Sequence, residues 1–476
     1  MPTATVSVLP SAAHSRMREV FEKQRETALR LRTSTPAQRI AKLKTLRDAV
    51  FSRTDTWYEA GWADFKKPPG EVDLAELLPI AIEVNDAIKN LGQWMKPVRV
   101  PATLVMAGTS SHIRYEPKGR TLIMSPWNYP VNLTFCPLVS AIAAGNTAML
   151  KPSEMTPHLS AAMAKLVKEV FTEDEVALFE GDAQVAQALL ELPFDHVFFT
   201  GSPAIGKVVM AAAAKHLASV TLELGGKSPT IVDETADVDL AAQNIIWGKC
   251  ANAGQTCIAP DHVYVHEKLK ERFVERCRVH LDKAFGKDEV SPHLARIVNA
   301  RHTARLKGML DEAKAKGARV LAGDRVSESD CFIAPTLLEG APEETKLMQE
   351  EIIGPLLPII PYTKLSEVID RINAAPKPLA LYVFSRSDDA VSEVIGKTSS
   401  GGAVVNHSLM QYAHAHLPFG GVNNSGIGNA HGYFGFKAFS HERAVVKAQL
   451  KVGKLLKPGE LPSAARKALH KAWKLV

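Results

Sequence analysis

A cysteine flanked by small residues is the first position in this sequence that indicates chemistry. Cys257 lies in the segment GQTCIAP (residues 254–260), whose small side chains leave its thiol approachable. A loop that holds the thiol near the start of a helix would favour the thiolate, which is the nucleophilic form. A lone cysteine is more often a small buried hydrophobic residue. On the residues alone, both interpretations of Cys257 stay open.

Two further polar residues lie in or beside predicted strands. Glu223 interrupts the apolar run 220–224, and burial there would raise its pKa towards the range of a general base. Asn128 follows the apolar run 121–125, at the end of a strand, where active-site groups of parallel sheets collect. Each residue has a structural alternative, which is a buried ion pair for Glu223 and an ordinary turn for Asn128.

A predicted strand-to-helix junction forms a third candidate site. The apolar run 197–200 ends at Gly201, Ser202 is a suitable helix N-cap, and Pro203 suits the first helical position. Gly206 follows on the first turn, so free backbone N–H groups could bind a phosphate here. The spacing is not G-x-G-x-x-G, which leaves a tight turn without a ligand as the alternative.

The elements around these residues predict the fold class. Residues 35–38 combine a Thr N-cap, a Pro and a Gln that can close a capping box. The segment KKPPG (66–70) breaks the helical pattern, which resumes over 74–94. From about residue 120, short apolar runs alternate with helical stretches, and a second alternating set spans 231–418. This alternation predicts an α/β protein with mostly parallel sheets covered on both faces.

Composition restricts the class of protein further. The 476 residues are 46% hydrophobic and 23% charged, as in ordinary globular proteins. Five widely spaced cysteines without a CxxC pair exclude a disulfide framework and suit a reducing compartment. Residues 447–476 carry eight Lys or Arg and one Glu, so this tail accounts for the net charge of +6. A nucleic-acid-binding protein would instead spread its basic residues over a folded face. With no signal peptide or membrane span evident, we expect a cytoplasmic protein.

Seven segments together resemble the NAD(P)-dependent aldehyde dehydrogenase superfamily. In chain order they are SPWNYP, KPSEMTP, FTGSPAIG, LELGGKSP, GQTCIAP, EEIIGP and PFGGVNNSGIG. The segments PLALYVFS (378–385) and HGYFGFKAFSHERA (431–444) are most similar to the class 3 branch, which includes fatty, aromatic and coniferyl-type aldehyde dehydrogenases. The resemblance implies oxidation of an apolar aldehyde, aromatic or medium- to long-chain aliphatic, to the carboxylic acid.

The resemblance also implies a role for each polar residue named above. Cys257 would attack the aldehyde and carry first a thiohemiacetal and then a thioester. Asn128 would stabilise the oxyanion together with the backbone N–H of Cys257. Glu223 would activate the water that hydrolyses the thioester.

Cofactor-binding residues are implied in the same way. They are Trp127, Lys151, Glu154, Gly201, Ser202, Gly206, Gly225 and Glu351. The Glu154 carboxylate would oppose a 2′-phosphate, so NAD is expected as the cofactor, although Lys151 could also attract that phosphate and permit NADP. Ile353 departs from the family, which commonly has Phe beside the cofactor at this position.

Substrate residues are less clearly marked. Tyr129 and Trp247 are candidates for the wall of an apolar pocket, with ordinary core packing as the alternative for Trp247. His407, His414 and His416 lack the spacing of metal ligands, so no metal site is expected.

The implied fold is an aldehyde dehydrogenase-like α/β fold in four parts. A Rossmann-type NAD-binding domain spans 1–107 and 119–225, and an α/β catalytic domain spans 226–419. A bridging β-element (108–118 and 420–447) precedes a basic tail (448–476). The polar alternation of the bridging strands predicts pairing with a second subunit, and therefore a homodimer.

A helix that starts at Ser463 is predicted in the basic tail. It would place Ala465, Leu469, Trp473 (or Ala472) and Val476 on one stripe. Such a helix either packs on the protein near the substrate entrance or makes peripheral contact with an anionic membrane.

Three other functions compete with aldehyde oxidation. A thiol esterase or hydrolase could use Cys257 and Glu223 without redox chemistry, but it would have no use for a dinucleotide site. A CoA-acylating dehydrogenase would not need Glu223, and a non-enzymatic scaffold would need none of these residues.

Overall fold

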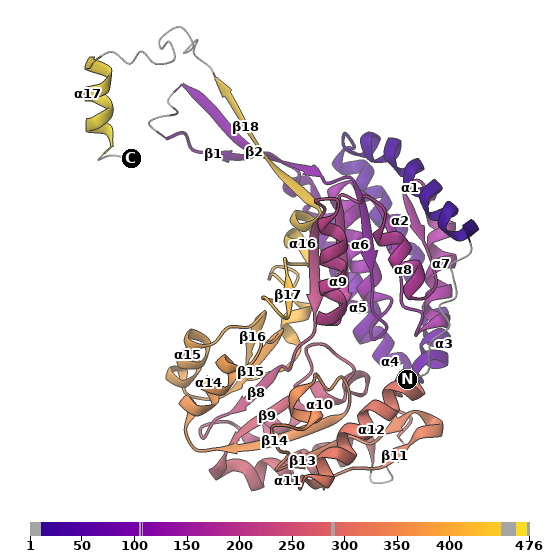
Figure 1. Cartoon of the computed structure of the whole chain (residues 1–476), viewed down its shortest axis with the longest axis vertical. Helices are drawn as coiled ribbons and strands as arrows, with labels where there is room; N and C mark the ends of the chain where they lie inside the picture. Colours follow the sequence, from indigo (N-terminus) through magenta and orange to yellow (C-terminus); the bar gives the residue numbers. More distant parts are fainter. Residues whose placement is uncertain (1–10, 104–105, 107, 287–290, 449–462, 474–476) are drawn as a thin grey trace.

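Five parallel strands form the centre of the first half of the chain (Figure 1). The structure, a computed structural model, describes residues 11–103, 106, 108–286, 291–448 and 463–473. The strand order of this sheet is β17-β7-β6-β3-β4-β5, with β17 antiparallel to β7. The strands are β3 (Arg120–Met124), β4 (Thr147–Lys151), β5 (Val176–Leu178), β6 (His196–Gly201), β7 (Ser219–Leu224) and β17 (Gly426–Ile427). The chain order reverses between β3 and β6, and ligands bind at such a switch point, outside the carboxyl ends of the strands.

Helices cover both faces of this sheet, as the alternation of strands and helices predicted. Ile123, Leu150 and Phe198 belong to the core on one face, and the neighbouring Leu122, Met149 and Phe199 to the core on the other. The first core includes residues of α2 (Pro36–Phe51), α3 (Thr54–Phe65), α5 (Leu78–Trp94), α6 (Asn132–Ala144) and α7 (Pro157–Val170). The second includes residues of α1 (Ser11–Leu31), α8 (Ala183–Leu190) and α9 (Pro203–Ala214). The doubly wound arrangement confirms the predicted α/β class.

A seven-stranded sheet forms the second half. Its order is β10-β13-β14-β9-β8-β15-β16, and only β10 pairs antiparallel. The strands are β8 (Pro229–Val232), β9 (His262–His266), β10 (Arg319–Ala322), β13 (Thr336–Glu339), β14 (Leu356–Tyr362), β15 (Ala380–Phe384) and β16 (Gly402–Val405). The main helices are α10 (Val238–Cys250), α11 (Lys270–Phe285), α12 (Ala300–Ala315), α14 (Leu365–Ala374) and α15 (Asp388–Lys397). Only residues 225–228 separate β7 from β8, so the carboxyl end of β7 faces this second half.

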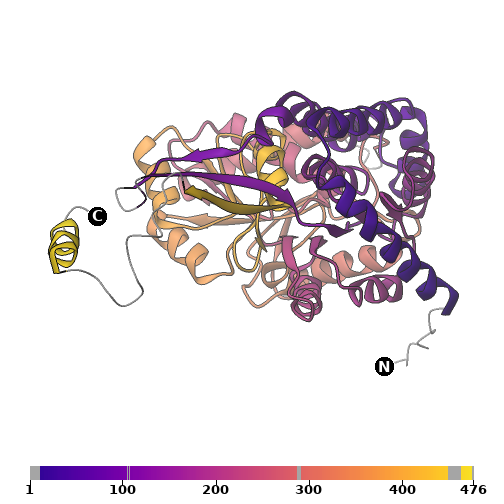
Figure 2. The ribbon, with the colours of Figure 1, turned by 90° about the horizontal axis from the view of Figure 1, so that it is seen from above.

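A third, three-stranded sheet extends from the body as an arm (Figures 1 and 2). It consists of β1 (Val98–Val100), β2 (Thr109–Pro117) and β18 (Ser440–Ala448). Residues 426–438 lie with the first half instead, because β17 pairs with β7 and α16 (Gly432–Ala438) packs on α6 and α5. The arm is therefore shorter than the segment 420–447 expected to form the bridging element.

The tail contains the expected helix, α17 (Ser463–Ala472), which lies beyond the arm in both views. The side chains of Ala465, Leu469 and Ala472, and the whole of Val476, fall outside the described residues, so the predicted stripe has no structural description. Across the parts of the chain that the structure describes, no helix combines the length and the apolar character needed to cross a membrane.

Two helix starts confirm local predictions. The Thr35 side chain and Gln38 form a reciprocal capping box at the start of α2. Ser202 caps α9 by accepting a hydrogen bond from the Ile205 N–H, with Pro203 at the first helical position.

Candidate active site

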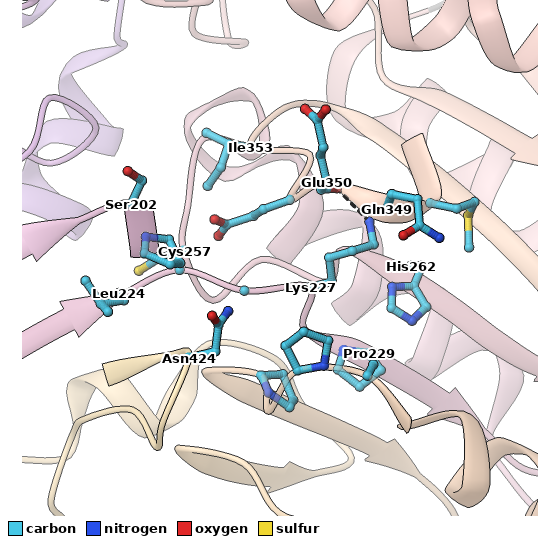
Figure 3. Close-up of a pocket in the computed structure, with 18 of the residues that line it drawn as sticks. Ser202, Leu224, Lys227, Pro229, Cys257, His262, Gln349, Glu350, Ile353 and Asn424 are labelled. Atoms are coloured by element: carbon cyan, nitrogen blue, oxygen red, sulfur yellow. Dashed lines mark hydrogen bonds between the residues drawn. The ribbon is translucent and has the colours of Figure 1, made fainter. Parts of the chain in front are cut away.

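Loops from both halves meet at one cavity of about 1130 Å³. Asn128 follows β3, Gly201 ends β6, Gly225 follows β7, and Cys257 approaches from the second half. In Figure 3, Ser202, Leu224 and Cys257 lie at one end of the cavity, and His262 and Gln349 lie at the other. The switch point of the first sheet is therefore the site where the predicted catalytic residues come together.

The loop that carries Cys257 is fixed by a buried glutamine. Gln255 Nε2 donates to the carbonyls of Asn252 and Arg296, each at 2.9 Å, and its Oε1 accepts from the Val298 N–H at 2.9 Å. Asn252 and Ala253 both hold φ at 52°, a left-handed conformation that is costly for residues other than glycine. Such a conformation persists only where neighbouring contacts enforce it, so this loop is positioned rather than pliable.

The electrostatics at Cys257 correct one expectation. Burial, together with the nearby carboxylates of Glu351 and Glu223, raises the pKa of the Cys257 thiol to about 12. Backbone hydrogen bonds act in the opposite direction but do not outweigh burial. The loop therefore favours the thiol rather than the thiolate, and a base must remove the proton before the sulfur can attack.

Glu223 is unpaired within the part of the chain that the structure describes. It lies on β7 and is buried, and neither carboxylate oxygen has a hydrogen-bond partner among the described residues. Burial raises its pKa well above the ordinary value. Within the described part of the chain, Glu223 therefore does not form the buried ion pair that was its structural alternative. Its carboxyl group is free to exchange a proton.

Asn128 connects β3 to the Cys257 loop. Its side-chain Nδ2 donates to the Gln255 carbonyl at 3.0 Å, and its Oδ1 is buried without a hydrogen-bond partner among the described residues. The backbone carbonyl of Asn128 accepts hydrogen bonds from Lys67 Nζ at 3.1 Å and from Asn252 Nδ2 at 2.8 Å. Asn128 is thereby held through both its side chain and its backbone, and it lines the cavity.

Two glycines lie close to neighbouring side chains where the first sheet borders the cavity. A Cβ added at Gly225 would lie 2.5 Å from the Glu351 carboxylate carbon, and one at Gly201 would lie 2.5 Å from Cζ of Phe199. Gly206 lies outside the wall of the cavity, so its contact with a cofactor stays a prediction. It is buried against Leu224, which a Cβ would meet at 2.7 Å.

The Glu351 carboxylate lies against Gly225, and Glu351 belongs to a loop that Lys227 holds. Lys227 Nζ donates to Asp261 Oδ1 at 2.6 Å and to the Glu350 carbonyl at 2.9 Å (dashed in Figure 3). Glu351 Oε1 is buried without a partner among the described residues, and burial raises the pKa of Glu351 to about 8. Ile353, the departure from the family pattern, lines the same cavity at a φ of 47°, which is unusual for a β-branched residue.

Lys151 and Glu154 lie beside the cavity rather than in its wall. Lys151 ends β4, and its Nζ lies 3.0 Å from Glu154 Oε2. Neither residue is among those that line the cavity. The two residues form the expected pair, and their contact with a cofactor stays a prediction.

A histidine that sequence reasoning missed lines the cavity beside Trp127. The His302 ring centroid lies 5.0 Å from that of Trp127, and neither ring nitrogen has a hydrogen-bond partner in the described structure. Burial is the main cause that lowers the pKa of His302 to about 4. Nothing in the sequence marks His302, which lies on the first turn of α12.

A second cavity, of about 30 Å³, lies on the other side of the reacting groups. The two cavities share Thr200, Glu223, Leu224 and Cys257. The other lining residues of the small cavity are mostly apolar and include Leu133, Pro137, Phe198, Leu379 and Phe419.

The two proposed substrate residues line neither cavity. Tyr129 is buried behind the loop, where its hydroxyl lies 2.6 Å from Thr256 Oγ1. Trp247 is 53% exposed, so it is not the core residue considered as the alternative, and its ring contacts His407. Within the described residues, no group of three His, Cys, Asp or Glu side chains could hold a metal ion.

Comparison with known proteins connects this geometry to a family. A model of the aldehyde dehydrogenase family matches residues 2–445. The 4,4'-diaponeurosporen-aldehyde dehydrogenase of Staphylococcus aureus is 42% identical over 406 residues, which cover 85% of this chain and 88% of the relative. Aldehyde dehydrogenase family 3 member B1 of Homo sapiens is 42% identical over 431 residues, 90% and 89% of the two chains. The substrate-bound structure of Staphylococcus aureus AldH matches with a TM-score of 0.91 at 38% identity, over 96% of this chain and 99% of that one.

Proposed function

Because the chain belongs to the aldehyde dehydrogenase family, we propose that it oxidises apolar aldehydes, aromatic or medium- to long-chain aliphatic, with NAD(P)+ and with NAD preferred. The observation that carries this proposal is that Cys257 and Glu223 lie where two cavities meet. The family 3 relatives agree with the class 3 resemblance. None of the comparisons supports a thiol hydrolase.

The residues of the large cavity fit a dinucleotide. Its volume suits a ligand of that size, and Ser202 stands at the start of α9, where free backbone N–H groups attract phosphate. The buried oxygen of Glu351 and both ring nitrogens of His302 lack partners among the described residues and would accept or donate hydrogen bonds to ribose hydroxyls or an amide. When bound, NAD(P)+ supplies the acceptor for the hydride that leaves the substrate.

In the first step, Cys257 adds to the aldehyde carbon. Because its pKa is raised to about 12, the thiol must lose its proton as the bond forms, and this proton passes to solvent through the large cavity, which Cys257 lines. The aldehyde oxygen becomes an alkoxide that accepts hydrogen bonds from the second Asn128 N–H and the Cys257 backbone N–H. One such donor lowers a barrier by about 3 kcal/mol.

In the second step, Glu223 directs hydrolysis. Loss of hydride from the thiohemiacetal carbon leaves an acyl thioester on Cys257. The Glu223 carboxylate then takes a proton from a water molecule, whose oxygen attacks the thioester carbon and displaces the Cys257 sulfur. Glu223 then returns this proton to the departing sulfur, so the products are the carboxylic acid and the free Cys257 thiol, and the cycle closes.

The small cavity supports the substrate class. Its volume of about 30 Å³ admits a carbonyl and the adjoining carbon. Phe198, Phe419 and Leu379 in its wall favour an apolar continuation of the substrate.

We also propose a homodimer formed through the arm. The edge strands β1 and β18 leave backbone groups unpaired within the described structure, and Val98, Val100 and Val446 on them are about half exposed. We likewise propose peripheral membrane contact through the tail, whose described residues include the exposed Arg466, Lys467 and Trp473.

Absorbance of NADH with a panel of aldehydes, with and without CoA, tests the function. We expect turnover of apolar aldehydes without CoA and loss of that turnover in Cys257→Ala. Ester hydrolysis alone would indicate the hydrolase, and strict dependence on CoA would indicate the acylating variant.

A further inference from the structure

A buried ion pair lies behind the proposed oxyanion site without taking part in the chemistry described so far. Lys67 Nζ lies 3.0 Å from Glu76 Oε1, and the two side chains are 0% and 1% exposed. Lys67 belongs to the segment KKPPG, which ends α3, where Lys66 adopts the left-handed conformation and two prolines follow. Transferring two charges from water into the interior is costly, so this pair calls for a reason beyond stability.

The ammonium group of Lys67 has two hydrogen-bond acceptors and two aromatic neighbours. It donates to Glu76 and, at 3.1 Å, to the backbone carbonyl of Asn128. It also lies 4.7 Å from the ring centroids of Phe65 and Tyr129, so aromatic faces cover its remaining side. Together with Asn252, Lys67 occupies both acceptor directions of the Asn128 carbonyl.

Glu76 holds the other end of the same segment. Its Oε2 accepts from the backbone N–H groups of Val131 at 3.1 Å and Asn132 at 2.9 Å, which open α6. A carboxylate is favourable at this end of a helix because unpaired N–H groups point towards it. The segment from Asn128 to Asn132 is therefore fixed at its first residue by Lys67 and at its last by Glu76.

We propose that the Lys67–Glu76 pair is a positioning device for the oxyanion hole, which holds the Asn128 amide at the reacting carbon through the Asn128 backbone. The proposal rests on the proposed role of Asn128 as oxyanion donor. Neither Lys67 nor Glu76 touches a cavity lined by Cys257, so both act through Asn128 and not on the substrate.

The test is a double-mutant cycle between the ion pair and Asn128. Lys67→Met/Glu76→Gln removes both charges of the pair at once, so neither partner is left as an unpaired ion, and the amide oxygen of the introduced glutamine can still accept from the α6 N–H groups. Single-turnover NADH formation is measured for this variant, for Asn128→Ala and for their combination. Thermal unfolding and cofactor affinity are measured in parallel.

We expect Asn128→Ala to slow NADH formation by about 100-fold or more. The ion-pair variant should slow it by about 10-fold or more with cofactor affinity unchanged. In the Asn128→Ala background, removing the pair should slow NADH formation by less than about 2-fold, because the side-chain amide that the pair positions is already absent.

Arg39→Met is the matched control. Arg39 is also a buried cation, and it donates to the Ala143 carbonyl at the other end of α6. Its loss should lower thermal stability and leave single-turnover NADH formation unchanged.

The inference would be overturned if the ion-pair variant formed NADH as fast as the wild type. It would also be overturned if removing the pair slowed NADH formation as much in the Asn128→Ala background as in the wild type. If Asn128→Ala itself leaves the rate unchanged, the proposed function of Asn128 fails instead.

Discussion

Substitution of Gly225 by Ala should separate cofactor binding from stability. The new Cβ would lie 2.5 Å from the carboxylate carbon of Glu351, whereas carbon atoms in contact are about 3.5–4.0 Å apart. The carboxylate must therefore move by roughly 1 Å or more. Because it is the end of a flexible side chain, the fold tolerates the movement, but Glu351 loses the position from which it would hold the cofactor ribose.

The magnitude follows from the interaction that is lost. A hydrogen bond to a charged group contributes about 1.5–3 kcal/mol, so the Kd for NAD+ should rise by about 10- to 150-fold. Calorimetric titration of NAD+ measures this Kd, and thermal unfolding should show a change in the free energy of unfolding below about 1 kcal/mol.

The neighbouring glycine is the control. A Cβ at Gly226 would meet the nearest atom, Cα of Pro378, at 3.4 Å, which is close to ordinary contact. Gly226→Ala should change the Kd by no more than about 3-fold. Equal affinities for wild type and Gly225→Ala, or a larger loss in Gly226→Ala, would refute the reasoning.

Three further predictions concern the base, the cofactor and the tail. Because the Glu223 carboxylate is the active form and burial raises its pKa, thioester hydrolysis should accelerate as the pH rises above the ordinary pKa of a glutamate, about 4.3; stopped-flow kinetics that show a fall with rising pH would contradict the role. Glu154→Ser should reduce the ratio of kcat/KM for NAD to that for NADP, because it removes the repulsion between Glu154 and the 2′-phosphate. A wild-type enzyme that strongly favours NADP would show that the role assigned to Glu154 is wrong. If α17 contacts membranes, truncation after Lys457 should abolish sedimentation with anionic vesicles and leave kinetics on soluble aldehydes unchanged. Lower thermal stability or altered activity towards long-chain aldehydes in the truncated protein would show instead that α17 packs on the protein.

Local features of the fold could be predicted because short segments determine them. The capping box of Thr35 and Gln38 depends on residues within one turn, and so does the cap at Ser202. The α/β class followed from alternating apolar runs, since strands buried on both faces need helices between them. In the same way, the apolar neighbours of Glu223 were sufficient to indicate a buried carboxyl group.

Contacts between distant residues could not be predicted in this way. The Lys67 ammonium reaches Asn128 across 61 positions, and Asn128 reaches Gln255 across 127. Tyr129 lies next to Asn128 in the sequence, yet it turns away from the cavities towards Thr256. The raised pKa of Cys257 arises from packing that no short segment reveals, because most of it comes from burial.

The covalent mechanism is tested most directly with Glu223→Gln. Rapid mixing with NAD+ and an apolar aldehyde should yield one NADH per active site, after which turnover stalls because the thioester is not hydrolysed. Mass spectrometry of the stalled enzyme should then find the acyl group on the peptide that contains Cys257. Steady turnover at the wild-type rate, or a burst that leaves the Cys257 peptide unmodified, would contradict the account.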